Sequence, residues 1–159
     1  MVNSCKLDKI IEGLNHKMIL QNIGLNGFED ADLTEVETAF MTQYSPEKVF
    51  IIYGTLAPNC PNHSVIEHIQ GTWRKGIVRG KFENKGWGAE SGYYGFKHVP
   101  FKEQSEIKAF ALSSDELVRH WQFLDEFEGS GYRRILTAFE SENGEIAVGS
   151  IYAINDDYQ

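Results

Sequence analysis

The acidic side chain with the most informative position in this sequence lies near the end of a predicted helix. The segment 114–128 carries one narrow apolar stripe, made of Leu117, Trp121 and Leu124. Glu128 takes the next position of that stripe, where the pattern calls for an apolar side chain. Desolvation there disfavours the ionised carboxylate, and the partial negative charge of the helix end acts in the same direction, so both raise its pKa. A glutamate with a pKa near neutrality can take and return a proton, which makes Glu128 the candidate acid/base.

The apolar stripe alone leaves one alternative for Glu128 open. The last turn of a helix frays, so the side chain could instead point to solvent past the end of the core. Glu126 provides a contrast, because it lies on the far face of the same helix, where an acidic residue carries no penalty. The two interpretations of Glu128 differ in whether its carboxyl group is buried.

A second candidate feature is the turn Tyr53-Gly54-Thr55-Leu56, which follows an apolar run. A strand that ends in glycine can release several backbone N–H groups into a concave turn, and such groups bind a carboxylate or a developing oxyanion. Taken singly, this short string is also what an ordinary strand-to-loop turn looks like. The turn therefore gains meaning only in combination with other features.

The side chains needed for other common chemistries do not form convincing sets. Cys5 and Cys60 are the two cysteines, they form no C-x-x-C pair, and we interpret them as free thiols. His63 and His68 are poorly spaced for two ligands on one helix face. We find no nucleophilic triad and no zinc-type ligand spacing, so we expect no metal and no cofactor.

Most of the elements that must position these residues are predicted strands. The run 49–53 is β-branched and aromatic throughout, which is typical of a buried central strand. Asn143-Gly144 predicts a tight hairpin turn between the last two strands. The predicted strands are 49–53, 73–82, 106–112, 132–140 and 145–154.

One strong helix, 114–128, interrupts these strands. Its start has the pattern of a capping box, with Ser113 as N-cap and Glu116 at the third helical position, and Gly129 is suited to follow its end. The predicted class is therefore α+β, a mixed sheet or small barrel around one principal helix.

The first 45 residues form a predicted helical extension, 1–45, ahead of the main domain, 46–159. Ile10, Leu14 and Met18 give the first helix, 6–21, an apolar stripe. A second helix follows Asp32 and includes Leu33, Val36, Phe40 and Met41. We expect these helices to pack on the main body, because a single apolar face is usually buried on its own chain. Self-association into a homodimer is the alternative that stays open.

Composition limits the classes of partner. The 15 Lys and Arg against 23 Asp and Glu give a net charge of −8, which repels phosphate backbones and anionic lipid, so we expect neither nucleic acid nor membrane partners. No export signal and no apolar run long enough to span a bilayer are recognisable in the sequence. We therefore expect a soluble, cytoplasmic protein.

The helix end at Glu128 and the turn Tyr53-Gly54-Thr55-Leu56 together resemble segments of a known family. The segment 49–56 is similar to the opening strand and Y-G-[ST]-L loop of the gamma-glutamylcyclotransferase superfamily, and 124–129 followed by Tyr132-Arg133 is similar to its L-D-x-x-E-G…Y-R segment. The hairpin that ends in Ser150-Ile151-Tyr152 resembles its final strands. Order and spacing agree over roughly residues 48–155, and the ordered set is more specific than any single motif.

The resemblance implies a small mixed β-barrel and a cofactor-independent enzyme that converts a gamma-glutamyl amide into 5-oxoproline and a free amine. It implies that Glu128 is the acid/base. The substrate-binding residues would be Tyr53, Gly54, Thr55, Leu56, Tyr132 and Tyr152.

Several points stay open at this stage. For Tyr152, core packing is the alternative role. Trp87, Tyr93 and Tyr94 could wall the pocket or pack a surface loop, and Asp125 is expected to hydrogen-bond a neighbouring loop. The leaving amine is not determined by the sequence. A non-catalytic module that binds gamma-glutamyl compounds is the main alternative function, and an amide hydrolase is a weaker one.

Overall fold

The computed structural model describes residues 4–21, 32–83 and 95–155. Helices α1 (Ser4–Gln21) and α2 (Glu35–Tyr44) precede the strands, and α3 (Trp121–Glu128) lies between β4 and β5. The strands are β1 (Val49–Ile52), β2 (Thr72–Glu83), β3 (Gly95–Lys97), β4 (Ser105–Ser113), β5 (Tyr132–Ser141) and β6 (Ile146–Ile154).

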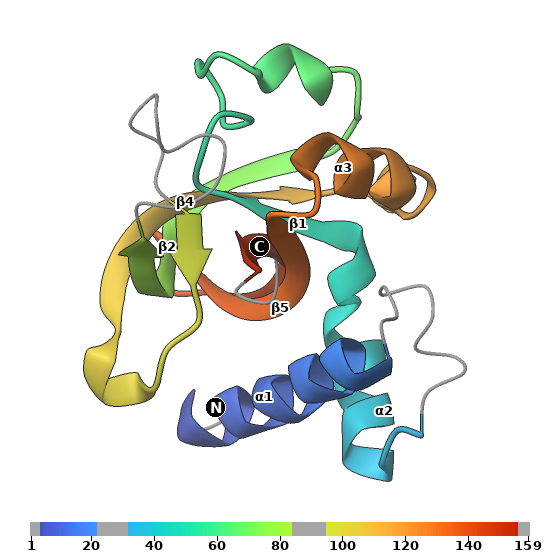
Figure 1. Cartoon of the computed structure of the whole chain (residues 1–159), viewed down its shortest axis with the longest axis vertical. Coiled ribbons are helices and arrows are strands. Elements are labelled where there is room, and N and C mark those ends of the chain that lie inside the picture. Colours follow the sequence, from blue (N-terminus) through green and yellow to red (C-terminus); the bar gives the residue numbers. More distant parts are fainter. Residues whose placement is uncertain (1–3, 22–31, 84–94, 156–159) are drawn as a thin grey trace.

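Five of these strands close into a barrel. Around the ring, β1 pairs with β4, β4 with β2, β2 with β5 and β5 with β6, all antiparallel. The parallel pairing of Phe50 with Ser150 joins β6 back to β1, where a side chain at Gly149 would approach the carbonyl oxygen of Val49 to 2.7 Å. β3 bridges β2 and β6. Figure 1 shows α3 on one side of the barrel and α1 with α2 on the other, so the predicted α+β barrel is confirmed.

The barrel wall has an apolar inside and a partly covered outside. Ile51 of β1 belongs to the cluster that fills the barrel, together with residues of every other strand. Phe50 and Ile52 point the other way, into a second cluster with Trp121 and Leu124 of α3. Both faces of β1 are therefore buried, which explains its unbroken apolar run.

The predicted strands are all present, each within one residue of its expected ends. The predicted hairpin is confirmed as well. Its turn uses Gly144 at φ 88°, and β5 pairs with β6 from Tyr132 opposite Ile154 to Glu140 opposite Ile146. β3 has three residues and was not predicted, because so short a segment carries no readable periodicity.

The principal helix departs from its prediction. A 3₁₀ turn, Asp115–Arg119, comes first and α3 begins only at Trp121, with His120 between them. The N-cap is Ser114, whose hydroxyl oxygen accepts a hydrogen bond from the amide of Glu116. Ser113 was the predicted cap, but it is the last residue of β4 and pairs with Thr72.

The N-terminal helices pack on the barrel, as expected. Leu7, Ile11 and Leu14 of α1 are buried against Leu136 of β5 and Val148 of β6. Each fully buried aliphatic side chain of this kind contributes about 1.5–3 kcal/mol. The side chain of Met18, which was predicted to belong to the stripe, lies outside the described residues.

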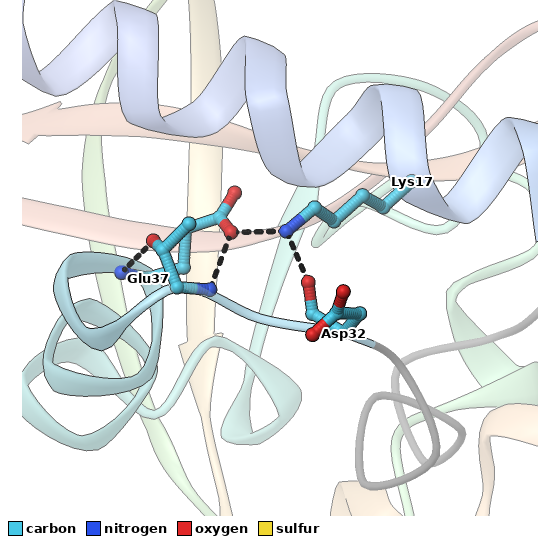
Figure 2. Close-up of polar contacts among 4 residues, drawn as sticks. Lys17, Asp32 and Glu37 are labelled. Atoms are coloured by element: carbon cyan, nitrogen blue, oxygen red, sulfur yellow. Dashed lines mark hydrogen bonds and ion pairs between the residues drawn. The ribbon is translucent and has the colours of Figure 1, made fainter.

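The start of α2 is fixed by a capping box that also holds α1. Thr34 is the N-cap, so Leu33 lies before the helix and not in it, and Val36 is exposed. The Glu37 carboxylate accepts a hydrogen bond from the Thr34 amide. Figure 2 shows it also accepting from Lys17 of α1, which in addition donates to the carbonyl of Asp32. This ion pair ties the two helices together.

Candidate active site

Tyr53 leads from β1 into the Y-G-T-L turn and is anchored at its hydroxyl. The hydroxyl donates to the carbonyl of Tyr152 at 2.6 Å and accepts from the amide of Phe96 at 3.0 Å. Burial raises the pKa of Tyr53, and the charges of Glu128 and Tyr132 raise it further. The phenol therefore stays protonated and fixes the strand end to β3 and β6.

The turn after Tyr53 is folded back by its own carbonyl groups. The carbonyl of Gly54 accepts from the Ala57 amide, and the carbonyl and hydroxyl of Thr55 accept from the backbone and side-chain amides of Asn62. Within the described ranges, the amides of Thr55 and Leu56 donate to no protein acceptor. A methyl group placed on Gly54 would meet none of the described residues within 4 Å, so among them open space adjoins the turn.

Leu56 has a different role from its neighbours in the turn. Its side chain is 3% exposed and packs in the cluster beneath α3, while its carbonyl contacts Nδ1 of His63 at 2.9 Å. Leu56 thus anchors the turn by its side chain, and only its amide remains for a ligand.

Glu128 lies on the last turn of α3 and is half-buried. Burial raises the pKa of its carboxyl group from 4.5 to about 7. The apolar stripe below it is intact, because Leu117, Trp121 and Leu124 are all buried even though the helix is interrupted. A side chain wholly in open water does not fit this burial, so the structure favours the buried interpretation over the solvent-facing one.

Glu128 is near residues of two separate strands. After burial itself, the Glu128 charge is among the influences that raise the pKa of both Tyr53 on the β1 side and Tyr152 on β6. Tyr132, at the start of β5, acts on Tyr53 in the same way and packs against the cluster that contains Leu56. The end of β1, the end of β6 and the start of β5 thus lie at one end of the barrel, and Glu128 is near enough to Tyr53 and Tyr152 for its charge to act on both.

Asp125 and Arg134 form a contact that the sequence did not reveal. Nε and Nη2 of Arg134 donate to the two carboxylate oxygens of Asp125 at 2.9 and 3.1 Å, and the Tyr152 hydroxyl donates to Oδ1 at 2.6 Å. Asp125 was expected to bond a neighbouring loop, but its partners lie on β5 and β6. The signal that could have pointed to Arg134 is a cation among the apolar residues of a strand buried on both faces.

Some predictions fall elsewhere. Trp87, Tyr93 and Tyr94 lie outside the described residues. A groove of about 570 Å³ between β2, β4 and the β5–β6 turn, lined in part by Lys75 and Lys108, contains no predicted site residue. In the part of the chain that the structure describes, no group of three or more His, Cys, Asp or Glu could hold a metal ion, and no helix is long and apolar enough to cross a membrane.

Solved structures with a similar fold are known. YkqA from Bacillus subtilis matches with a TM-score of 0.51 and 23% identity over 68% of this chain, which spans 36% of YkqA. An AIG2-like protein from Mus musculus, also named ggact, matches with a TM-score of 0.50 and 22% identity over 70% of this chain and 79% of that protein. No protein-family model matches the sequence, and no curated protein matches it.

These likenesses bear on the fold and not on the reaction, because both identities are below 25%. The closed barrel of five strands and the ordered motifs at 49–56 and 124–133 agree with them. At the level of architecture, the chain therefore has the fold of YkqA and of the AIG2-like protein, which agrees with the barrel implied by the resemblance drawn from the motifs.

Proposed function

We propose that this protein is a gamma-glutamylcyclotransferase, which converts a gamma-glutamyl amide into 5-oxoproline and a free amine. The observation that carries the proposal is the half-buried carboxyl group of Glu128, with a pKa of about 7, beside the strand end that leads into the Y-G-T-L turn. A group with this pKa is suited to transfer protons near neutral pH. The likeness in fold to the AIG2-like protein named ggact is consistent with this proposal.

In the proposed reaction the nucleophile belongs to the substrate. The Glu128 carboxylate removes a proton from the substrate's α-ammonium group, and the freed amine attacks the γ-carbonyl carbon of the same molecule. A C–N bond forms, the ring closes and the carbonyl oxygen becomes an oxyanion. When the bond to the leaving group breaks, Glu128 returns its proton to the departing nitrogen, so the carboxylate is regenerated. The ring nitrogen, which carries two hydrogens after the attack, gives its second proton to the released amine or to water, so that 5-oxoproline keeps one N–H. Neither a nucleophile from the protein nor a metal is required.

The turn supplies the electrostatic part of this mechanism. The amides of Thr55 and Leu56 would bind the oxyanion or the substrate's α-carboxylate, and preorganised N–H groups in a partly dry site are effective at this. The space beside Gly54 that the described residues leave open would receive the glutamyl group. Tyr53 would hold the turn in place through its two hydrogen bonds, and Tyr132 would close the site from β5.

The test is turnover by the purified protein. We would offer gamma-glutamyl amides of an amino acid, of the lysine side chain and of a polyamine, together with glutathione, and measure 5-oxoproline. Glu128→Gln keeps the size of the side chain and removes the base, so we expect a loss of at least about 100-fold. Glu126→Gln is the matched control, because Glu126 is an exposed acid on the same helix. For the wild type, kcat/KM is expected to rise with pH through about 7 as Glu128 loses its proton.

The outcomes separate the candidate functions. Turnover that survives in Glu128→Gln would exclude the assigned acid/base. Saturable binding of a gamma-glutamyl amide by the wild type without any 5-oxoproline would favour the non-catalytic module. The amide that is turned over fastest would identify the class of leaving amine.

A further inference from the structure

Tyr152 is engaged at both ends by the two halves of the candidate site. Its hydroxyl donates to Oδ1 of Asp125 on α3, and its carbonyl accepts from the hydroxyl of Tyr53, each at 2.6 Å. The side chain is 5% exposed, and its ring packs edge-on against Phe50 at 5.8 Å. One residue of β6 therefore links the strand end that leads into the Y-G-T-L turn to the helix that carries Glu128.

The partner of Tyr152 on the helix is itself held rigidly. Arg134 of β5 binds both carboxylate oxygens of Asp125, and a forked pair of this kind restrains position and orientation together. The Arg134 guanidinium group is buried and lies 4.6 Å from the centre of the Trp121 ring at the start of α3. The helix is thus attached to the barrel through Asp125 as well as through its apolar stripe.

Asp125 is close enough along the helix to control Glu128. The two residues are three positions apart, so they lie within one turn of the same helix. The carbonyl of Asp125 also accepts from the amide of Gly129, which is the bond that ends α3 directly after Glu128. A displacement of the Asp125 side chain would therefore move the end of the helix.

We propose that Tyr152 and Arg134 are positioning residues, which act through Asp125 to hold Glu128 at the barrel end. The inference rests on the proposed function for its catalytic consequence. It gives the Tyr152 hydroxyl a different role from the substrate contact expected from the sequence, since that hydroxyl already has a carboxylate partner. The two roles have different kinetic signatures.

The first experiment separates positioning from binding by steady-state kinetics on the amide that is turned over fastest. Tyr152→Phe removes only the hydroxyl, Asp125→Asn keeps the shape of the carboxylate, and Arg134→Lys keeps the charge but loses the fork. We expect each to lower kcat about tenfold, with KM within about twofold, because misplacement of a reacting group affects the transition state. The double variant of Tyr152 and Asp125 should be no slower than Asp125→Asn alone. Glu126→Gln should match the wild type.

The second experiment needs no turnover. The ¹³C-labelled carboxyl group of Glu128 is titrated by NMR in the same set of proteins, after thermal unfolding has shown that each variant is folded. We expect a pKa near 7 in the wild type and in Glu126→Gln. In Tyr152→Phe and Asp125→Asn, the released helix end lets water reach Glu128, so its pKa should fall toward 4.5.

The results distinguish the positioning role of Tyr152 and Arg134 from the proposed function. A raised KM with unchanged kcat in Tyr152→Phe would make the hydroxyl a substrate contact and overturn the inference. Unchanged kcat together with an unchanged Glu128 titration would overturn it too. If the wild type turns over no gamma-glutamyl amide but the Glu128 pKa falls in the variants, the proposed function fails while the positioning role stands.

Discussion

At the scale of single residues, two carboxylates of one helix meet opposite environments. Asp125 is matched by the Arg134 guanidinium group and by the Tyr152 hydroxyl. Glu128, one turn later, has its pKa raised to about 7 by burial. The proposed function gives Glu128 the proton-transfer role and leaves Asp125 a structural one, which fits the different partners of the two carboxylates.

The raised pKa of Glu128 has a consequence for stability. The folded value of about 7 lies above the ordinary 4.5, so between these values the folded protein binds more protons than the unfolded chain. The unfolding free energy therefore falls as pH rises through this window. Since one pKa unit corresponds to about 1.4 kcal/mol and the group is partly exposed, the loss above pH 7 is about 1–3 kcal/mol.

Glu128→Gln avoids this loss because its side chain does not ionise. Relative to the wild type, it should gain about 1–3 kcal/mol between pH 5 and pH 8, measured by urea-induced unfolding at both values. Glu126→Gln, on the exposed face, should show no such gain. A stability difference between Glu128→Gln and the wild type that does not depend on pH would contradict the raised pKa.

At the scale of elements, local patterns predicted what depends on local contacts. The barrel strands were recognisable from apolar runs and from the alternation of apolar and polar residues. The burial of Glu128 followed from its place on the apolar stripe of the helix. The interruption at His120 was hidden, because the 3₁₀ turn keeps Leu117 on the same face as Trp121. Arg134 was missed because its pairing with Asp125 depends on how α3 lies across β5 and β6, which no single segment encodes.

The end of α3 depends on a conformation that favours glycine. Gly129 has φ 82° and ψ 179°, a region that other residues enter only under strain. Gly129→Ala should lower the unfolding free energy by about 1–3 kcal/mol and reduce turnover, because the strain falls directly after Glu128. Unfolding in urea and 5-oxoproline release would measure both effects.

Gly131→Ala is the matched control for this prediction. Gly131 does not have a positive φ, and a methyl group there would meet no residue of the described ranges within 4 Å, as at Gly129. The two substitutions add the same atom in equally open surroundings, so they differ only in backbone conformation. Equal unfolding free energies of the two variants would show that a side chain at position 129 causes no backbone strain.

At the scale of the whole molecule, α1 completes the barrel wall. On the side of β5 that faces β2, only Glu140 and Ser141 pair with β2. Within the described ranges, no strand therefore lies beside Leu136 on that side. The side-chain amide of Asn15 fills that place, donating to the Leu136 carbonyl at 2.9 Å and accepting from its amide at 2.8 Å. A helix residue thus continues the hydrogen bonding of the sheet.

Asn15→Ala should therefore destabilise the barrel itself. It leaves a buried amide and a buried carbonyl of β5 unpaired, which costs about 2–4 kcal/mol, whereas His16→Ala, at the exposed next position of α1, should stay within about 0.5 kcal/mol of the wild type.

Deletion of residues 1–45 removes in addition the burial of Leu7, Ile11 and Leu14, about 5–9 kcal/mol in sum. That sum is comparable with the whole stability of a small domain, so residues 46–159 alone should not unfold cooperatively in urea. If residues 46–159 instead unfold in one sharp urea transition, the N-terminal helices are not needed for the stability of the barrel.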